Sequence, residues 1–137
     1  MENRGPEPVW IQDAVVKAIH SRQISEHGRL AGIRDENMLA SALARPRNLY
    51  LYGEPAPDLS ALAAAYAYGL ARNHAFVDGN KRVSLVVCRT FLILNGLDIE
   101  ASQDEKYITW WNLAAGEVTE EVLAEWIRQR TIHSGSP

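Results

Sequence analysis

The sequence is poor in cysteine and has no long hydrophobic run. Cys88 is the only cysteine, which excludes a disulfide framework and a cysteine-based zinc site. Because it lies in the apolar run 83–88 (VSLVVC), we expect it to be buried as a small hydrophobe, without a nucleophilic or redox role. The polar, proline-broken residues 1–8 contain no apolar signal core, and no later stretch is long enough to span a membrane. A cytoplasmic location is therefore predicted.

Positive charge is also scarce. The formal net charge is −3, whereas a broad nucleic-acid surface needs a net basic face to neutralise phosphates. We therefore expect neither direct nucleic-acid binding nor a membrane partner. Internal repeats, low-complexity tracts and linkers are not found either, so the 137 residues predict a single domain (1–137) with a core at about 9–130 and loose ends. A chain of this length buries a proper core without crosslinks.

Apolar residues recur with helical rather than strand periodicity along most of the chain. Side chains suited to N-capping precede four of the expected helices: Asp35, Asp58, Ser102 and Thr119. Pro46 is expected to end the second helix. The pattern predicts an all-α, compact bundle of about six helices, with a short extended piece at 97–101. The predicted helices are residues 9–23, 37–45, 59–72, 80–94, 102–115 and 119–130.

Side chains outside the helical stripes leave several alternatives open. His20 is expected at the exposed end of the first helix. Arg34, in the glycine-containing loop that follows, is either functional or a tether for that loop. Residues 48–57 (NLYLYGEPAP) predict an aromatic loop closed by prolines. Tyr50 and Tyr52 in this loop either flank a substrate groove or pack over the core.

Residues 74–82 (HAFVDGNKR) concentrate ionisable and polar groups between two apolar helices. His74 carries an imidazole, the side chain best suited to remove a proton from a hydroxyl at cellular pH. Asp78 either caps the next helix or carries Mg²⁺, which needs only one or two carboxylates beside phosphate oxygens. Gly79 permits close approach of a ligand and a positive φ angle. Phe76 is expected to seat the loop in the core.

Asn80, Lys81 and Arg82 open the helix after this loop, and a helix N-terminus offers free N–H groups to an anion. Lys81 and Arg82 are either plain exposed cations or the ligands of a molecule long enough to reach both, such as a di- or triphosphate. Because cations at this end oppose the helix dipole, the second alternative is favoured. The residues alone thus predict a phosphate site with a plausible general base; the loop is neither a Walker A loop nor a kinase glycine-rich loop.

The run 74–82 resembles the signature loop of the Fic/Doc family, His-x-Phe-x-Asp/Glu-x-Asn-x-Arg. With lysine at position 81 it is similar to the Doc, or death-on-curing, branch, whereas the adenylylating Fic branch has glycine there. Three further segments resemble those of Doc-like proteins: 32–35 (GIRD), 41–46 (SALARP) and 114–117 (AAGE). The resemblance therefore covers roughly residues 25–130.

This resemblance implies the small α-helical Fic/Doc core and a nucleotide-dependent transferase site with ATP and Mg²⁺. His74 would act as base on a target hydroxyl and Asp78 would hold the magnesium. Lys81, as in the Doc pattern, implies a nucleotide bound in the reverse orientation, so that the γ-phosphate faces the nucleophile. The implied catalytic residues are His74, Asp78, Lys81 and Arg82. The implied nucleotide ligands are Gly79, Asn80, Lys81 and Arg82.

By the same resemblance the chain is the toxin of a toxin–antitoxin pair, which phosphorylates a protein hydroxyl and so inhibits translation; the Doc target is elongation factor Tu. Fic-like AMP transfer and a catalytically idle binding module are the alternatives. No convincing copy of the family's inhibitory helix is found, so control by a Phd-like antitoxin is expected, with Tyr50 and Tyr52 as a candidate groove wall. Ala75, which replaces a proline frequent in Fic loops, concerns loop stiffness more than chemistry.

Overall fold

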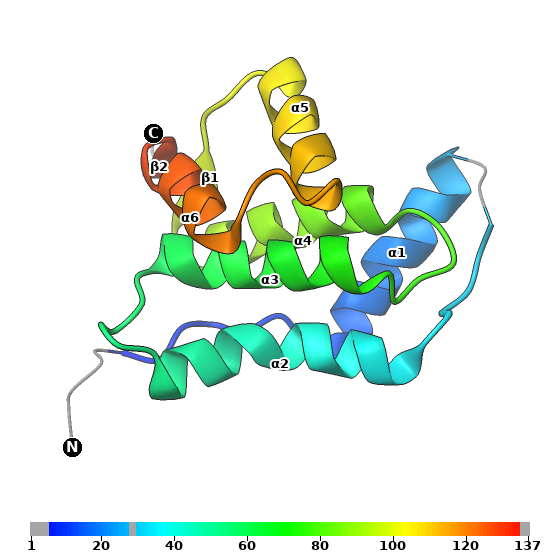
Figure 1. Cartoon of the computed structure of the whole chain (residues 1–137), viewed down its shortest axis with the longest axis horizontal. Coiled ribbons are helices and arrows are strands. Elements are labelled where there is room, and N and C mark those ends of the chain that lie inside the picture. The colour runs from blue at the N-terminus through cyan, green and yellow to red at the C-terminus, as the bar shows by residue number, and fades with distance from the viewer. Residues whose placement is uncertain (1–5, 28–29, 135–137) are drawn as a thin grey trace.

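Helices account for most of the structure, as the periodicity predicts. The computed structural model describes residues 6–27 and 30–134, and most of the termini expected to be loose lies outside these residues. The elements are α1 (Asp13–His27), α2 (Glu36–Tyr52), α3 (Leu59–Asn73), α4 (Asn80–Leu94), β1 (Leu97–Ile99), α5 (Gln103–Ala114), α6 (Glu120–Arg128) and β2 (Thr131–His133). α2 lies along one side of α3, and α5 and α6 lie on the other (Figure 1). The predicted all-α bundle of about six helices is confirmed.

α3 is the central helix because its small residues let its neighbours approach closely. It packs against α2, α4, α5 and α6, and a run of its alanines is fully buried: Ala63, Ala64, Ala65, Ala67 and Ala71. Gly69 marks a point of close approach, since a Cβ there would lie 3.1 Å from the Cα of Ala42 in α2. α4 is less central than its apolar sequence suggests, because Ile93 and Leu94 near its end are exposed.

The predicted helix caps are confirmed. Four side chains accept a hydrogen bond from a backbone N–H in the first turn of their helices: Asp35, Asp58, Ser102 and Thr119. These bonds satisfy donors that a helix start leaves without a partner. α4 begins at Asn80 and ends at Leu94, as predicted. Gly96 follows it with a φ angle of +89°, which glycine adopts without steric penalty.

The first helix is displaced from its predicted position, since α1 begins at Asp13 and runs to His27. The residues before it are extended because distant side chains bind their backbone. Val9 donates its N–H to the Asn95 side chain at 2.8 Å and its carbonyl accepts from the same amide at 3.0 Å. The Ile11 N–H donates to the Tyr66 hydroxyl at 3.1 Å. Tertiary hydrogen bonds therefore replace the helical ones in this segment.

The prediction that Pro46 ends the second helix is wrong, because α2 continues through it to Tyr52. Proline removes one backbone donor and normally breaks a helix. Here the proline is buried, and the preceding turn at Ala42 is pressed against Gly69 of α3. Packing along α3 therefore overrides the local preference. As a consequence, residues 48–52 are helical rather than part of an aromatic loop.

A small two-stranded sheet closes the C-terminal part. The extended piece predicted at 97–101 is present as β1, which pairs antiparallel with β2 so that Asp98 faces Ile132. Arg89 of α4 binds the Asp98 carboxylate with two N–H groups, at 2.9 and 3.0 Å. This ion pair lowers the pKa of the Asp98 carboxyl. Such a bidentate pair fixes the hairpin to α4.

A buried hydrogen-bond chain connects α3, α4 and α5. Ser84 donates from its hydroxyl to the Ala67 carbonyl at 2.7 Å and accepts from the Trp110 indole N–H at 2.9 Å. Both side chains are almost completely buried. Cys88, one turn further along α4, is buried as predicted, and burial raises the pKa of its thiol. The core therefore holds a satisfied polar network and an unreactive thiol.

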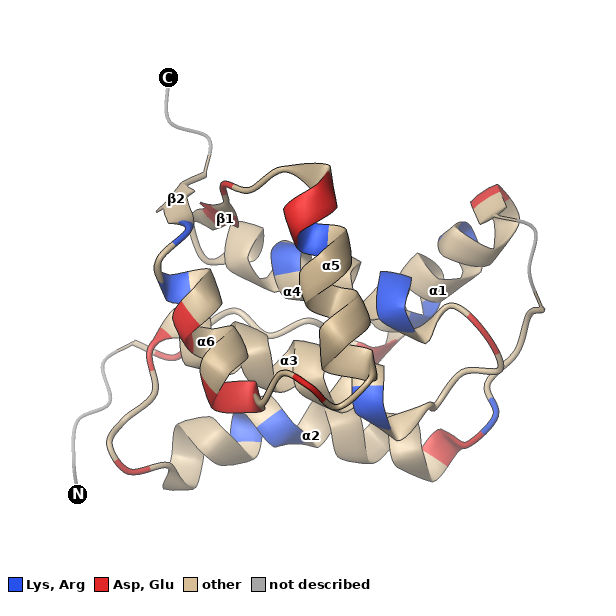
Figure 2. Cartoon of the chain, turned by 45° about the horizontal axis from the view of Figure 1, so that its top comes forward, with Lys and Arg blue, Asp and Glu red and all other residues tan. Residues whose placement is uncertain are grey.

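Charged residues are distributed over several elements rather than on one face. Figure 2 shows Lys and Arg segments scattered among Asp and Glu segments over several helices. None of the helices in the described part of the chain combines the length and apolar character needed to cross a membrane.

Replacing Ser84 should test the buried network. Ser84→Ala leaves the buried Trp110 N–H without an acceptor, so we expect the free energy of unfolding in urea to fall by about 1–3 kcal/mol. Thr109→Ala removes an exposed side-chain bond to the Glu105 carbonyl and serves as the control, with a loss below about 0.5 kcal/mol. Equal losses for the two variants would contradict a stabilising role for the network.

Candidate active site

The loop between α3 and α4 reverses the chain within residues 74–79. It starts with His74 in the left-handed conformation, φ 50° and ψ 46°, which is uncommon for a residue with a Cβ. Arg34 holds this turn, because its Nε donates to the His74 carbonyl at 2.8 Å and its guanidinium also reaches the Asn73 carbonyl at 3.4 Å. The Asn73 side chain donates to the Met38 carbonyl in α2 at 3.1 Å. Of the two roles open for Arg34, the structure shows the tethering one.

A short antiparallel bridge supports the next residues of the loop. Ile33 pairs with Phe76, and the Val77 N–H donates to the Gly32 carbonyl at 3.1 Å. The Ala75 carbonyl accepts from the N–H groups of Arg34 and Asp35 at 2.8 and 3.0 Å. The segment before α2 therefore acts as a backbone support for the loop.

Phe76 and Asn80 close the loop on itself. The Asn80 side chain accepts from the Phe76 N–H at 3.1 Å and donates to the Phe76 carbonyl at 3.0 Å. The Phe76 ring is 1% exposed, so the prediction that it seats the loop in the core is confirmed. In this arrangement both polar atoms of the Asn80 amide are engaged within the loop. The backbone N–H of Asn80 lies at the start of α4, where a helix offers no intrahelical acceptor.

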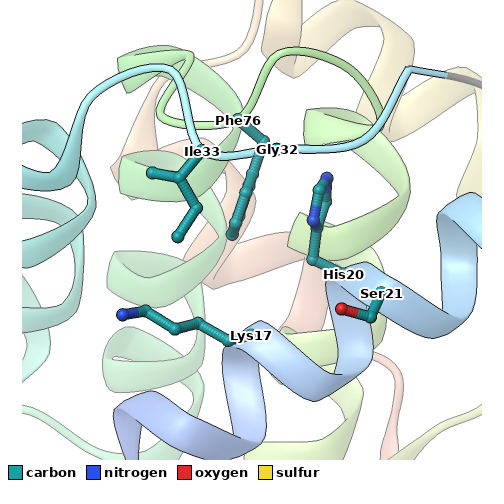
Figure 3. A pocket seen from close by; sticks show the side chains of 6 residues that line it. All are labelled: Lys17, His20, Ser21, Gly32, Ile33 and Phe76. Carbon is teal, nitrogen blue, oxygen red and sulfur yellow. The ribbon is translucent and has the colours of Figure 1, made fainter.

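His20 of α1 lies against the inner face of the loop. Its ring stacks on Phe76, with the centroids 3.9 Å apart and the planes at 11°. Its Nε2 is 3.0 Å from the Asp78 carbonyl. Figure 3 shows the two rings side by side. Both line a cleft of about 300 Å³, together with Lys17, Ser21, Gly32 and Ile33. The prediction of His20 at an exposed helix end is wrong, because α1 continues past it and turns the imidazole to the core, at 4% exposure.

The N-terminus of α4 is open to an anion. Gly79 is its N-cap residue, with φ 82° and no side-chain capping bond, so the alternative that Asp78 caps the helix is excluded. Lys81 and Arg82 in the first turn are both exposed, and neither pairs with a carboxylate of the described chain. The free N–H groups, the positive end of the helix dipole and these two exposed cations are groups that could bind a polyanion.

An aromatic face on α5 adjoins this site. The Lys81 ammonium lies 4.3 Å from the centre of the Trp111 ring. Tyr107, Ile108 and Trp111 are 63%, 58% and 51% exposed, and with Asn112 they line a cleft of about 300 Å³. An exposed set of large apolar side chains beside a cation offers a stacking surface for a planar ring.

Asp78 fits Mg²⁺ bound together with a nucleotide. Its Oδ1 accepts from the Gly79 N–H at 2.8 Å, and its Oδ2 has no partner among the residues that the structure describes. No cluster of three or more metal-ligating side chains is found in those residues. A single carboxylate suits Mg²⁺, which keeps several waters and takes further ligands from phosphate oxygens.

The structure thus places all the predicted site residues in one loop and the turn after it: His74, Asp78, Gly79, Asn80, Lys81 and Arg82. The His74 imidazole is exposed and has no hydrogen bond to a described residue. Tyr50 and Tyr52 are not part of this region. They lie at the opposite end of α2, where Tyr50 packs on Trp10 at 5.7 Å, so their prediction as a wall of this groove is wrong (Figure 1).

Sequence reasoning missed His20 and Trp111. His20 follows Val16 by four residues, and both are buried on one stripe of α1, so the i,i+4 spacing could have indicated an inward side chain. Tyr107 and Trp111 share the same spacing on α5, with rings 6.0 Å apart. No sequence signal places this pair beside Lys81, because the contact joins two different helices.

One family model and two known proteins are similar to this chain in sequence. The family model described as "Fic/DOC family" matches residues 10–92, a stretch that includes α1 and the loop. The chain is 47% identical over 73 residues to "Toxin Doc" of Mycolicibacterium smegmatis, covering 53% of this chain and about half, 55%, of that relative. It is 31% identical over 112 residues to "Protein kinase doc" of Escherichia phage P1, covering 82% of this chain and 87% of the relative.

The pair of hydrogen bonds between the Asn80 side chain and the Phe76 backbone should hold the loop closed. Asn80→Ala leaves the Phe76 N–H and carbonyl without partners, so we expect a loss of about 1–3 kcal/mol in the free energy of unfolding and faster hydrogen exchange at the Phe76 amide. Asn80→Asp keeps the acceptor for that amide and is the matched control, with exchange close to the unmodified chain. Unchanged exchange in Asn80→Ala would show that the bond does not restrain the loop.

Proposed function

The chain belongs to the Fic/DOC family, in its Doc branch, and on that premise we propose that it is a Doc-like toxin that transfers the γ-phosphoryl group of ATP to a hydroxyl of a protein. The observation that carries the proposal is the N-terminus of α4, which has no side-chain cap and whose Lys81 and Arg82 pair with no carboxylate of the described residues. It lies one short loop after His74, an exposed histidine at the end of α3. This arrangement supplies an anion site and a candidate base within one nine-residue stretch.

His74 is proposed as the general base. Its imidazole accepts the proton of the target hydroxyl, the hydroxyl oxygen forms a bond to the γ-phosphorus, and the bond to the β-phosphate oxygen breaks to release ADP. In phosphoryl transfer the protein contributes mainly alignment of the reactants and stabilisation of charge, with little covalent chemistry of its own. Arg34 binds the His74 carbonyl in the left-handed turn, which supports a fixed position for the backbone that carries the imidazole.

The phosphates are proposed to bind at the first turn of α4. Gly79 has no Cβ to block them, Asn80 offers its backbone N–H, and Lys81 and Arg82 supply charge on diverging sides of the helix. A triphosphate is long enough to meet both cations. Asp78 would hold Mg²⁺, which neutralises charge on the phosphate oxygens when bound.

The nucleoside is proposed to rest on the aromatic face of α5. Tyr107 and Trp111 present exposed rings beside Lys81, so a phosphate chain that reaches Lys81 brings the base close to them. Stacking of a base on an aromatic side chain is worth about 1–3 kcal/mol. Asn112, in the same cleft, adds an amide that can donate to and accept from a base edge.

The biological context follows from the two relatives, whose names are those of a toxin and of a protein kinase. We propose that this chain acts in the cytoplasm on elongation factor Tu, inhibits translation, and is neutralised by a Phd-like antitoxin.

Labelled ATP should decide between the two possible transfers. With elongation factor Tu as target, we expect label from γ-labelled ATP to be retained and label from α-labelled ATP not to be. His74→Ala should reduce the rate by at least about 100-fold, the usual contribution of a general base, with the circular dichroism spectrum unchanged. Label retained only from the α position would replace the kinase proposal by AMP transfer. Full activity of His74→Ala would remove its role as base.

Trp111 should contribute to nucleotide affinity. Trp111→Ala is expected to raise the dissociation constant for ATP about tenfold, since a tenfold change corresponds to about 1.4 kcal/mol, within the range of about 1–3 kcal/mol for base stacking, while binding of inorganic tripolyphosphate stays within about twofold. Tyr52→Ala, an exposed aromatic at the far end of α2, is the matched control. If ATP binding is unchanged while the KM for the protein target rises, the aromatic face binds the target instead. Isothermal titration calorimetry measures both ligands.

A further inference from the structure

His20 is a buried titratable side chain that the proposed reaction does not use. It reaches the loop from α1, 58 residues earlier in the chain than its partner. We propose that His20 is a positioning residue, which fixes the Asp78 backbone and the Phe76 ring and thereby the direction of the Asp78 carboxylate and the start of α4. The catalytic consequence of this inference rests on the proposed phosphoryl transfer; its structural part rests on the contacts of the loop.

The first contact is a hydrogen bond whose direction is fixed by chemistry. The Asp78 carbonyl 3.0 Å away can only accept, so the His20 Nε2 carries the hydrogen. The imidazole is 4% exposed, and a polar ring at this depth is unfavourable unless its N–H finds a partner. The bond is therefore strongly favoured in the folded state, and the carbonyl is held at one orientation.

The second contact is the parallel stack on Phe76, with ring centroids 3.9 Å apart. Phe76 is itself locked by the Asn80 side chain through its N–H and its carbonyl. His20 thus touches the loop at two points, residues 76 and 78, with only Val77 between them. Two anchors this close leave little freedom for the intervening backbone.

The peptide between Asp78 and Gly79 is what these anchors orient. Its carbonyl binds His20, and its N–H donates to the Asp78 Oδ1 at 2.8 Å. Because the peptide is planar, a fixed carbonyl fixes the N–H and through it the carboxylate. Gly79 is also backed by α1, since a Cβ there would lie 3.9 Å from the His20 Cδ2 and 3.5 Å from the Ile24 Cδ1.

A packing role alone does not account for this residue. Phenylalanine fills a similar volume and stacks on Phe76 without the cost of burying a polar ring. What only the imidazole adds is the donor to Asp78. A variant that keeps the stack and removes the donor therefore separates the two roles.

The test compares His20→Phe, His20→Gln and Ser84→Ala. His20→Phe keeps the stack and loses the donor; His20→Gln carries a side-chain N–H that can reach the same carbonyl. Ser84→Ala loses a buried bond to a backbone carbonyl away from the loop and controls for a general loss of stability. For His20→Phe we expect kcat to fall at least about tenfold, because small misplacements of reacting groups are costly, while the KM for ATP changes by less than about threefold.

Hydrogen exchange at the Gly79 amide is the second measurement, and it does not require activity. We expect faster exchange in His20→Phe, near-normal exchange and partial recovery of kcat in His20→Gln, and no change of either in Ser84→Ala. Because His20 lines a cleft, we expect free imidazole to enter His20→Ala and to restore part of its rate.

The outcomes separate this inference from the proposed function. Exchange at Gly79 and kcat both unchanged in His20→Phe would overturn the positioning role. An equal fall of kcat in Ser84→Ala would also overturn it, since a general loss of stability would then suffice. If the unmodified chain transfers no phosphoryl group, the proposed function fails, and the exchange measurement alone decides whether His20 orients the loop. If His20→Phe does not fold, the other two variants decide. Recovery of kcat in His20→Gln and in imidazole-treated His20→Ala supports the positioning role, and no recovery in either overturns it.

Discussion

Close packing along α3 is the constraint on which the rest of the structure depends. Its alanines and Gly69 bring α2, α4, α5 and α6 against one helix, so the end of α3 and the start of α4 are fixed relative to each other. Only residues 74–79 connect them. A reversal this short requires left-handed backbone at His74 and Gly79. The conformation of the candidate site is therefore a consequence of helix packing, and it needs support from outside the loop because such backbone is unfavourable for histidine.

Two sets of side chains differ in what they bind. The loop backbone is hydrogen-bonded by three side chains, Arg34 at residue 74, Asn80 at residue 76 and His20 at residue 78. The side chains of His74, Lys81 and Arg82 remain exposed and make no hydrogen bond within the described chain. A hydrogen-bonded backbone with exposed side chains would suit the proposed phosphoryl transfer, because positioning supplies much of the rate of such a reaction.

Sequence reasoning succeeded where the determining contact is local and failed where it joins distant segments. The caps at Asp35 and Asp58 and the bounds of α4 depend on neighbouring residues, and they were predicted correctly. The path of the chain through Pro46 depends on α3, and the burial of His20 depends on Phe76. For the site, the motif identified the loop, whereas the class of ligand that the loop binds stays a prediction. The contact between Lys81 and Trp111 and the pairing of β1 with β2 could not be read from the sequence, because nothing local encodes which surfaces meet.

The position of Lys81 explains how the free protein tolerates one of its two cations at the start of α4. A cation in the first turn of a helix is unfavourable by about 0.3–1 kcal/mol through the dipole. An exposed cation–π contact, such as that of Lys81 with Trp111 at 4.3 Å, returns about 0.5–1 kcal/mol. The two effects nearly cancel for Lys81, whereas Arg82 makes no compensating contact with the described residues. A polyphosphate bound there, as proposed, would reverse the sign of the electrostatic effect for both side chains at once. In the free protein the electrostatic cost that remains is therefore mainly that of Arg82, because the contact with Trp111 offsets the cost of Lys81.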